Sequence, residues 1–109
     1  NKNKYRLNEK INVVCKVRNI GNVEGKEVVQ VYFGKENSKV KRPKKELKGF
    51  KKVKVTSNEY VEVNINIPVK ELAYYDENST SWKIEKGNYI IYIGNSSREI
   101  SREIKIKII

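Results

Sequence analysis

The chain has 109 residues, with 24 Lys and Arg against 13 Asp and Glu, so its formal net charge is +11 at pH 7. One cysteine and no histidine exclude an internal disulfide, a zinc site of Cys and His side chains, and a histidine-based nucleophilic triad. No apolar run approaches the ~20 residues of a membrane span. The length fits one domain. Because the sequence contains no methionine and begins with Asn1, we predict that residues 1–109 are a single domain excised from a larger protein.

The first strands are predicted from the alternation of apolar and polar residues. Residues 11–18 alternate with a period of two, and residues 19–25 have the glycines and asparagines of a turn. Residues 26–34 form the next strand, and both of its faces are partly apolar. Val29, Val31 and Phe33 lie on one face, and Val28, Gln30 and Tyr32 lie on the other. Such a strand is central in its sheet or has its outer face covered.

The middle of the chain predicts a long loop followed by an irregular strand. The polar residues 35–46 form the loop. Residues 47–55 form the strand, in which Gly49 indicates a bulge or bend that lets both Leu47 and Phe50 turn inward to the core.

The remaining segments complete a set of short strands. Strands are expected at residues 61–67, 82–84, 89–93 and 103–108, and one helical turn is expected within residues 69–76. A loop over residues 77–81 and a turn over residues 94–97 separate them. About seven short strands without a long helix predict an all-β fold, an antiparallel immunoglobulin-like β-sandwich.

No residue pattern supports catalysis or cofactor binding. Asp76 is the one aspartate, the glutamates fall on outward strand positions, and the glycines stand singly at turns. A glycosidase carboxylate pair and a phosphate-binding loop are therefore not predicted. Cys15 is interpreted as a small buried hydrophobe, because no base is present to form its thiolate. We predict no catalytic residue, no cofactor and no metal.

Two binding functions remain as alternatives. The basic segment from Lys39 to Lys54 could contact nucleic-acid phosphates, but we expect Phe50 in the core and Tyr32 elsewhere, which leaves no base-stacking face. Aromatic side chains could also form a platform for sugar rings, although packing in the core and corners explains them as well. These residues are Trp82, Tyr74, Tyr75, Tyr89 and Tyr92. We predict that the chain binds neither nucleic acid nor membrane.

Several motifs follow one another in a fixed order. They are Asn19-Ile20-Gly21 with residues 25–32, Arg42-Pro43 with residues 45–50, residues 71–76, Trp82 with residues 85–89, and residues 94–98. In this order they resemble the fibronectin type III-like domain that ends many family 3 glycoside hydrolases of the β-glucosidase type. The resemblance covers the chain from about Ile11 to Ile109, with Ile20 and Glu71 as departures from the family pattern.

The resemblance implies a fibronectin type III-like sandwich that serves as a non-catalytic structural or accessory domain of a β-glucosidase. In such enzymes the catalytic aspartate and glutamate lie in upstream domains, against which this domain packs. We expect docking through the second face of residues 26–34, the proline loop and the aromatic turn, since interdomain surfaces mix polar and apolar residues. The candidate docking residues are Val28, Gln30, Tyr32, Arg42, Pro43, Tyr74, Tyr75 and Asp76.

The alternative function is a free-standing immunoglobulin-like adhesion or carbohydrate-binding module of a bacterial surface protein. The reading frame upstream distinguishes the two, because hydrolase domains would precede the first and repeated sandwiches or an anchor would accompany the second. A lone Cys15 without disulfides favours the cytoplasm over a secreted location.

Overall fold

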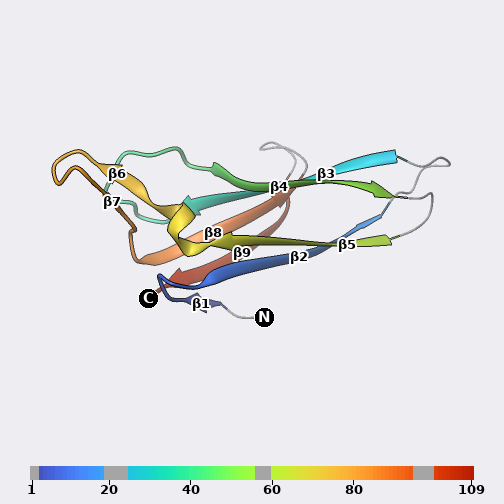
Figure 1. Cartoon of the computed structure of the whole chain (residues 1–109), viewed down its shortest axis with the longest axis horizontal. Helices are drawn as coiled ribbons and strands as arrows, with labels where there is room; N and C mark the ends of the chain where they lie inside the picture. The colour runs from blue at the N-terminus through green and yellow to red at the C-terminus, as the bar shows by residue number, and fades with distance from the viewer. Residues whose placement is uncertain (1–2, 19–24, 56–59, 95–99) are drawn as a thin grey trace.

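The computed structural model of the chain describes residues 3–18, 25–55, 60–94 and 100–109, and these residues are mostly β-strand (Figure 1). In chain order the elements are β1 (Lys4–Tyr5), β2 (Lys10–Arg18), β3 (Gly25–Lys35), β4 (Glu46–Val55), β5 (Tyr60–Pro68), the 3-10 turn η1 (Val69–Leu72), β6 (Tyr74–Asp76), β7 (Ser81–Lys83), β8 (Gly87–Gly94) and β9 (Ile100–Ile108). The turns predicted over residues 19–25 and 94–97 lie outside the described residues, except for Gly25 and Gly94 at strand ends.

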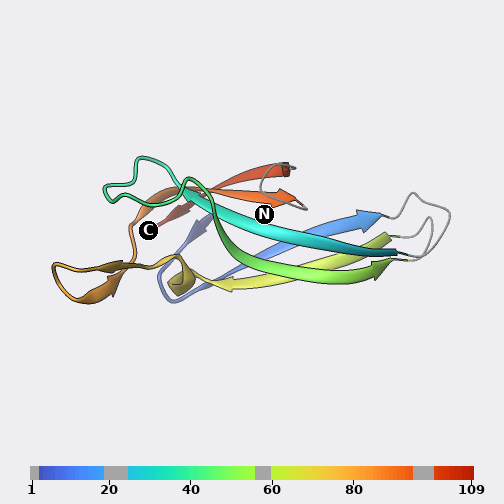
Figure 2. The same ribbon diagram turned by 90° about the horizontal axis from the view of Figure 1, so that it is seen from above.

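The strands form two layers around a common core. A five-stranded sheet with the order β1-β9-β8-β3-β4 packs against the two-stranded sheet β2-β5 (Figure 2). Neighbouring strands are antiparallel, except that β1 runs parallel to β9. The buried side chains between the layers include Ile11, Val13, Val63, Ile65 and Ile67 from one sheet and Val29, Val31, Phe33, Ile91, Ile93, Ile106 and Ile108 from the other. The predicted all-β sandwich is therefore confirmed.

The β2–β5 pair shows how alternation builds one layer. Its antiparallel register places Val13 opposite Ile65 and Cys15 opposite Val63. Each pair therefore turns two apolar side chains toward the core. Cys15 is half-buried against the core, and burial raises the pKa of its thiol. Cys15 therefore packs against the core as a small, partly buried side chain, in agreement with its interpretation from the sequence.

Strand β4 contains the predicted bulge, but its large apolar side chains point away from the core. The register between β3 and β4 shifts next to Val31, which lies opposite Gly49. Gly49 takes the inward position, where an added Cβ would lie 2.9 Å from Cγ2 of Ile65. Leu47 and Phe50 lie on the outer face and are 47% and 62% exposed. The prediction that both turn inward is wrong, because the close approach of β5 leaves no room there for a side chain.

The helical turn expected within residues 69–76 is present at one end of the sandwich as a 3-10 turn. The 3-10 turn ends at Leu72, and extended backbone resumes in β6. Val69 and Leu72 are fully buried, so the turn closes this end of the core. Strands β6 and β7 form a hairpin that projects beyond the two layers (Figures 1 and 2). Within the described part of the chain, no helix has the length and apolar character needed to cross a membrane.

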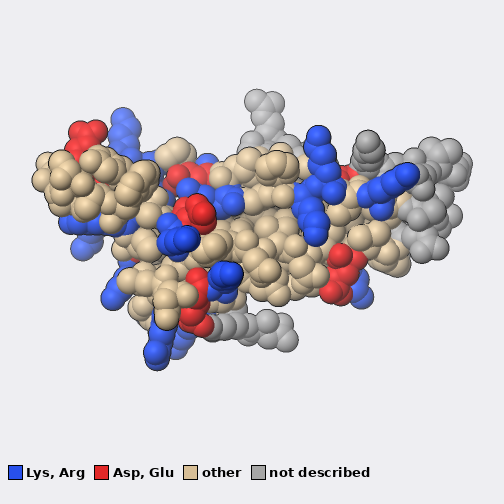
Figure 3. All heavy atoms as spheres, in the orientation of Figure 1, with Lys and Arg blue, Asp and Glu red and all other residues tan. Residues whose placement is uncertain are grey.

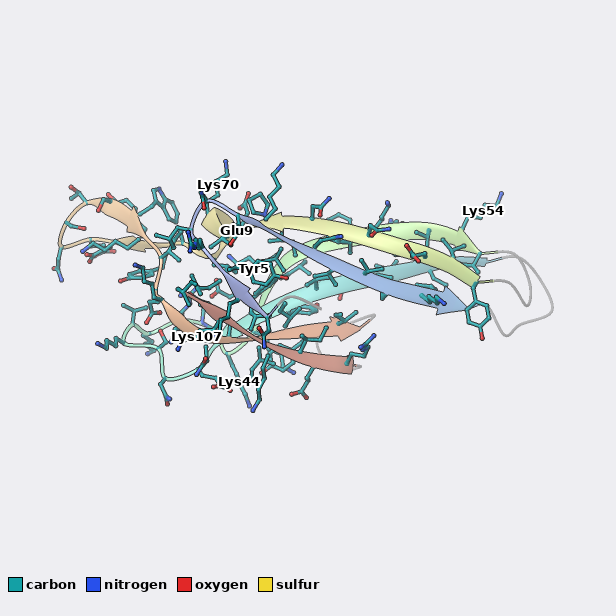
Figure 4. The ribbon with its side chains drawn as sticks, turned by 90° about the horizontal axis from the view of Figure 1, so that it is seen from below. Tyr5, Glu9, Lys44, Lys54, Lys70 and Lys107 are labelled. Atoms are coloured by element: carbon teal, nitrogen blue, oxygen red, sulfur yellow. The ribbon has the colours of Figure 1, made fainter. Side chains whose placement is uncertain are left out.

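Strand β1 has no counterpart in the sequence prediction. The backbone N–H of Lys107 donates to the carbonyl oxygen of Asn3 at 2.8 Å, and that of Ile109 donates to Tyr5 at 2.9 Å. The Tyr5 side chain is buried at the edge of the core. The first and last described strands therefore run side by side, as the labels of Tyr5 and Lys107 in Figure 4 indicate.

Candidate docking surfaces

The outer face of the five-stranded sheet carries the first group of candidate residues. Val28, Gln30 and Tyr32 alternate with the core residues of β3 and are half-buried. The Tyr32 hydroxyl donates a hydrogen bond to Oε1 of Gln30 at 2.6 Å. In β4, Phe50 lies opposite Gln30 and Leu47 opposite Tyr32. We call these five residues the outer-face patch, and an exposed apolar cluster of this kind marks an interaction surface.

A hollow of about 220 Å³ continues the outer-face patch. Its lining includes Gly34 of β3, Pro43 and Lys44 of the following loop, and Ile90 and Tyr92 of β8. Tyr92 lies opposite Tyr32, which connects the hollow to the patch. Gly34 is required here, because an added Cβ would lie 2.5 Å from the backbone oxygen of Lys44. Pro43 is exposed at this hollow, whereas its neighbour Arg42 also lines the hollow but has a mostly buried side chain.

Arg42 lies inside one end of the sandwich, with a side chain that is 8% exposed. Its Nε donates to Oε1 of Glu46 at 2.8 Å, and its Nη1 donates to Oε1 of Glu85 at 3.1 Å. Its Nη2 donates to the carbonyl oxygen of Leu72 at 3.2 Å. Burial lowers the pKa of Arg42, but the hydrogen bonds and charges of the two glutamates outweigh burial and raise it. Arg42 therefore ties the loop before β4 to the 3-10 turn and to the segment before β8.

Glu85 is the acidic centre of the same cluster. Its Oε1 also accepts the hydroxyl of Ser38 at 2.6 Å, and its Oε2 accepts the backbone N–H of Lys39 at 2.9 Å. Burial acts to raise the pKa of Glu85, but these bonds and Arg42 hold it below its ordinary value. The Tyr89 hydroxyl donates to the carbonyl oxygen of Glu85 at 2.7 Å, and burial raises the pKa of Tyr89 to about 12.

The β6–β7 hairpin, residues 74–83, carries the second group of candidates, and we call it the aromatic arm. The guanidinium carbon of Arg42 lies 5.8 Å from the ring centroid of Tyr74, a cation–π contact at the base of the arm. Farther out, Tyr75 and Trp82 meet edge to face, with centroids 5.4 Å apart and ring planes at 75°. They are 48% and 69% exposed, so the arm presents two large aromatic side chains to its surroundings.

Asp76 holds the turn at the tip of the aromatic arm. Its Oδ1 accepts the backbone N–H of Asn78 at 3.2 Å, and its Oδ2 accepts the hydroxyl of Ser79 at 2.9 Å. Nζ of Lys83 lies 3.0 Å from the same Oδ2. The hydrogen bonds from Lys83 and then Ser79 hold the pKa of Asp76 below its ordinary value. The carboxylate is therefore occupied within its own turn.

The eight candidate residues do not form one surface. The outer-face patch lies on the side of the five-stranded sheet that faces away from β2 and β5. The aromatic arm projects at one end of the molecule, on the side of β5 and the 3-10 turn (Figure 2). Arg42 bridges internal segments between them and belongs to neither surface.

Sequence reasoning missed Leu47, Phe50 and Glu85. The β3–β4 register would have identified the first two, because one extra residue at the bulge brings both apolar side chains to the face of Tyr32. The same register shows that the expectation of Phe50 in the core and Tyr32 elsewhere is wrong, since both side chains lie on the outer face. No local pattern points to Glu85, which meets Arg42 across 43 residues of sequence.

The aromatic residues considered for a sugar platform do not share a plane. Tyr89 and Tyr92 are buried, and Tyr74 lies against the Arg42 guanidinium. Tyr75 and Trp82 are exposed, but their nearly perpendicular rings offer no common flat surface to a sugar chain. This geometry favours packing against a shaped surface rather than stacking along a glycan.

Among the residues that the structure describes, no group of three or more Cys, Asp or Glu side chains is placed to hold a metal ion. In the same ranges, every buried side-chain nitrogen or oxygen has a hydrogen-bond partner. Within the described residues, no orphaned polar group therefore indicates a ligand.

The model of the fibronectin type III-like domain family matches residues 27–97, more than half of the chain. The chain belongs to this family. The matched range includes the whole outer-face patch, the Arg42–Glu85 cluster and the aromatic arm of this fibronectin type III-like domain. The resemblance stated from the motifs is confirmed.

Curated relatives of this fibronectin type III-like domain are β-glucosidases. Thermostable β-glucosidase B of Acetivibrio thermocellus is 41% identical over 101 residues, which are 93% of this chain and 13% of the relative. The β-glucosidase of Kluyveromyces marxianus is 43% identical over 103 residues, which are 91% of this chain and 12% of the relative.

Solved structures of β-glucosidases contain the same fold. The Kluyveromyces marxianus enzyme in complex with glucose matches with a TM-score of 0.88 and 42% identity, over 91% of this chain and 12% of that one. The Listeria innocua enzyme in complex with glucose matches with a TM-score of 0.90 and 27% identity, over 98% and 15%. The fibronectin type III-like chain thus spans roughly an eighth of the length of these relatives.

Proposed function

We propose that residues 1–109 form one domain of a β-glucosidase-type parent enzyme, dock onto its catalytic domains and stabilise them. The reaction then belongs to the domains outside this chain, which supplies no catalytic residue, and neither nucleic acid nor membrane is a partner. Relatives that extend far beyond the matched segment support this assignment. In the parent, the docking partner is always present at high effective concentration, because it is part of the same polypeptide.

The observation that carries the proposal is the outer-face patch. Leu47 and Phe50 are exposed beside half-buried Tyr32, on the outer side of a sheet whose inner side already forms the core. Burial of apolar surface contributes roughly 25 cal/mol per Å², so covering these side chains is favourable. The exposed rings of the aromatic arm, Tyr75 and Trp82, offer a second contact of the residue types that dominate protein interfaces.

The test compares two matched substitutions in the full-length parent. Leu47→Ser removes a side chain on the outer-face patch, and Val14→Ser removes one of similar exposure, 47% against 44%, on the opposite layer. We expect Leu47→Ser, alone and with Phe50→Ser, to lower the parent's Tm and its residual activity after heating, and Val14→Ser to leave both unchanged.

The same variants in the isolated 109-residue chain separate docking from folding. Surface substitutions without special contacts change stability by less than about 0.5 kcal/mol, so the isolated chain should keep its Tm. Equal Tm values for the parent carrying Leu47→Ser with Phe50→Ser and the parent carrying Val14→Ser would refute docking through this face.

A further inference from the structure

Charge is distributed unevenly across the outer face of the five-stranded sheet. The central strands β3 and β8 contribute Val28, Tyr32 and Ile90. The flanking strands contribute lysines at positions that share this face: Lys52 and Lys54 on β4, Lys105 and Lys107 on β9, and Lys4 on β1. Glu103, opposite Tyr92, is the acidic residue at these described positions. An apolar centre is therefore flanked on both sides by positive charge.

Three of the flanking lysines have no ionic partner within the described part of the chain. Lys4, Lys52 and Lys107 are exposed, and none of them forms an ion pair with another described residue. Lys4 lies directly beside Lys107 on the neighbouring strand. Like charges at such positions repel each other, so this arrangement costs stability in the isolated chain. Figure 4 shows how far the flanks extend, with Lys54 at the end of β4 and Lys107 on β9.

The opposite outer face, on β2 and β5, has a different composition. Lys16 lies opposite Glu62, Asn12 opposite Asn66, and Val14 opposite Asn64. This face therefore carries Glu62 as well as Lys10 and Lys16, with asparagines and Val14 between them, so its charges are mixed. Lys and Arg protrude at many places on the face drawn in Figure 3, and the register places an apolar centre between basic flanks on the outer face of the five-stranded sheet.

We infer that the surface of the parent chain that covers this face has an apolar centre and an acidic rim. The inference rests on the proposed docking and adds the chemistry of the partner. Interfaces commonly place apolar residues at the centre and charged residues at the rim, with opposite potentials facing each other. A docked acidic rim neutralises the Lys4–Lys107 repulsion and fixes the orientation of the domain on its partner.

The decisive variant is Lys52→Glu/Lys107→Glu in the full-length parent, with Lys10→Glu/Lys70→Glu as the control of equal charge change. Lys10 and Lys70 are exposed on the side of β2 and the 3-10 turn. At about 10 mM NaCl, where the Debye length is about 30 Å, we expect the rim variant to lower the parent's Tm by about 2–4 °C more than the control. At about 1 M NaCl the Debye length is about 3 Å, and the difference should vanish.

The isolated chain gives the opposite sign for the rim variant. Lys107→Glu places a carboxylate beside Lys4, so the isolated chain should melt at the same temperature or higher. A rim variant that is stable alone and unstable in the parent identifies lost docking. An equal loss in the isolated chain and the parent would mean that the lysines act in folding, and would overturn the inference.

Three further outcomes decide between partner classes. If Leu47→Ser/Phe50→Ser destabilises the parent while the rim variant behaves as its control at both salt concentrations, docking stands and the acidic rim is refuted. If neither variant has an effect, the proposed docking fails as well. The isolated chain could instead bind a thymidine oligonucleotide at about 150 mM NaCl, with Phe50→Ser and Lys52→Glu each abolishing binding. This result would show that the outer face binds single-stranded nucleic acid, and it would overturn the inference.

Discussion

Arg42 and Glu85 join segments of the chain that are far apart in sequence. The motif comparison assigns Arg42 to a docking surface together with Pro43, whereas the structure directs its guanidinium into the domain. Two buried charges cost several kcal/mol of desolvation, which is offset when hydrogen bonds satisfy both partners, as they do here. Arg42 therefore fixes the loop that carries exposed Pro43 through hydrogen bonds to groups inside the domain.

The depressed pKa of Glu85 makes stability depend on pH. A carboxyl whose pKa is lower in the folded state stabilises the fold above its unfolded pKa, near 4.5, and loses that contribution as pH falls through the folded value. We expect Glu85→Gln to lower the free energy of unfolding by about 1–3 kcal/mol at pH 7, the usual effect of a charged hydrogen bond. Urea denaturation from pH 7 to pH 3 should show the gap between wild type and variant closing below about pH 4.5.

The matched control is Glu71→Gln on the exposed side of the 3-10 turn. Its unfolding curve should follow that of the wild type at every pH. A gap for Glu85→Gln that stays constant down to pH 3 would show that the carboxylate charge contributes nothing and that only the side-chain shape matters.

The position of strand β4 in its sheet gives a structural reason for part of the basic segment from Lys39 to Lys54. It is the edge of the five-stranded sheet, so one side of its backbone lacks a neighbouring strand in that sheet. Exposed lysines and a bulge are common means of preventing edge-to-edge association, and β4 has both. The lysines at positions 51 and 52 thus have a structural reason that composition alone does not reveal.

Replacing these lysines should convert β4 into an aggregation-prone edge. Lys51→Val/Lys52→Val creates an apolar, β-branched run from Phe50 to Val53 on an unpaired strand. We expect the isolated chain to form larger species by light scattering and to bind thioflavin T within days at concentrations where the wild type stays monodisperse. Lys70→Val/Lys86→Val removes the same charge outside the strands, and aggregation of this control to the same extent would assign the effect to net charge instead.

Alternation predicts the one-sided strands closely. The expected strands at residues 11–18 and 61–67 become Lys10–Arg18 and Tyr60–Pro68, because each has one buried and one exposed face. The two-residue β1 is too short to show a period. The inward prediction for Phe50 fails because parity cannot show which of two residues at a bulge faces the core. Alternation along single strands could not place Leu47 and Phe50 beside Tyr32, since cross-strand register decides which side chains share a face.

At the scale of the whole molecule, the two layers have different outer faces. The first and last strands, β1 and β9, pair within the five-stranded sheet. The β2–β5 layer presents mixed charges and asparagines, while the five-stranded sheet presents an apolar centre with basic flanks. Strand β1 completes that sheet and contributes Lys4 to one flank. Strand β1 therefore contributes to the core through Tyr5 and to this outer face through Lys4.

The burial of Tyr5 predicts that β1 is part of the cooperative fold. Tyr5 is 7% exposed and lies opposite Ile108, and the Ile109 N–H donates to its carbonyl oxygen at 2.9 Å. Truncating a buried aromatic side chain costs about 3–5 kcal/mol, so Tyr5→Ala should lower the free energy of unfolding by about 3 kcal/mol in urea denaturation. Leu7→Ala, at a 42% exposed position in the following turn, should change it by less than about 0.5 kcal/mol. If Tyr5→Ala instead speeds amide exchange at Lys107 and Ile109 without changing the global unfolding free energy, then β1 is an attachment to a sandwich that folds without it.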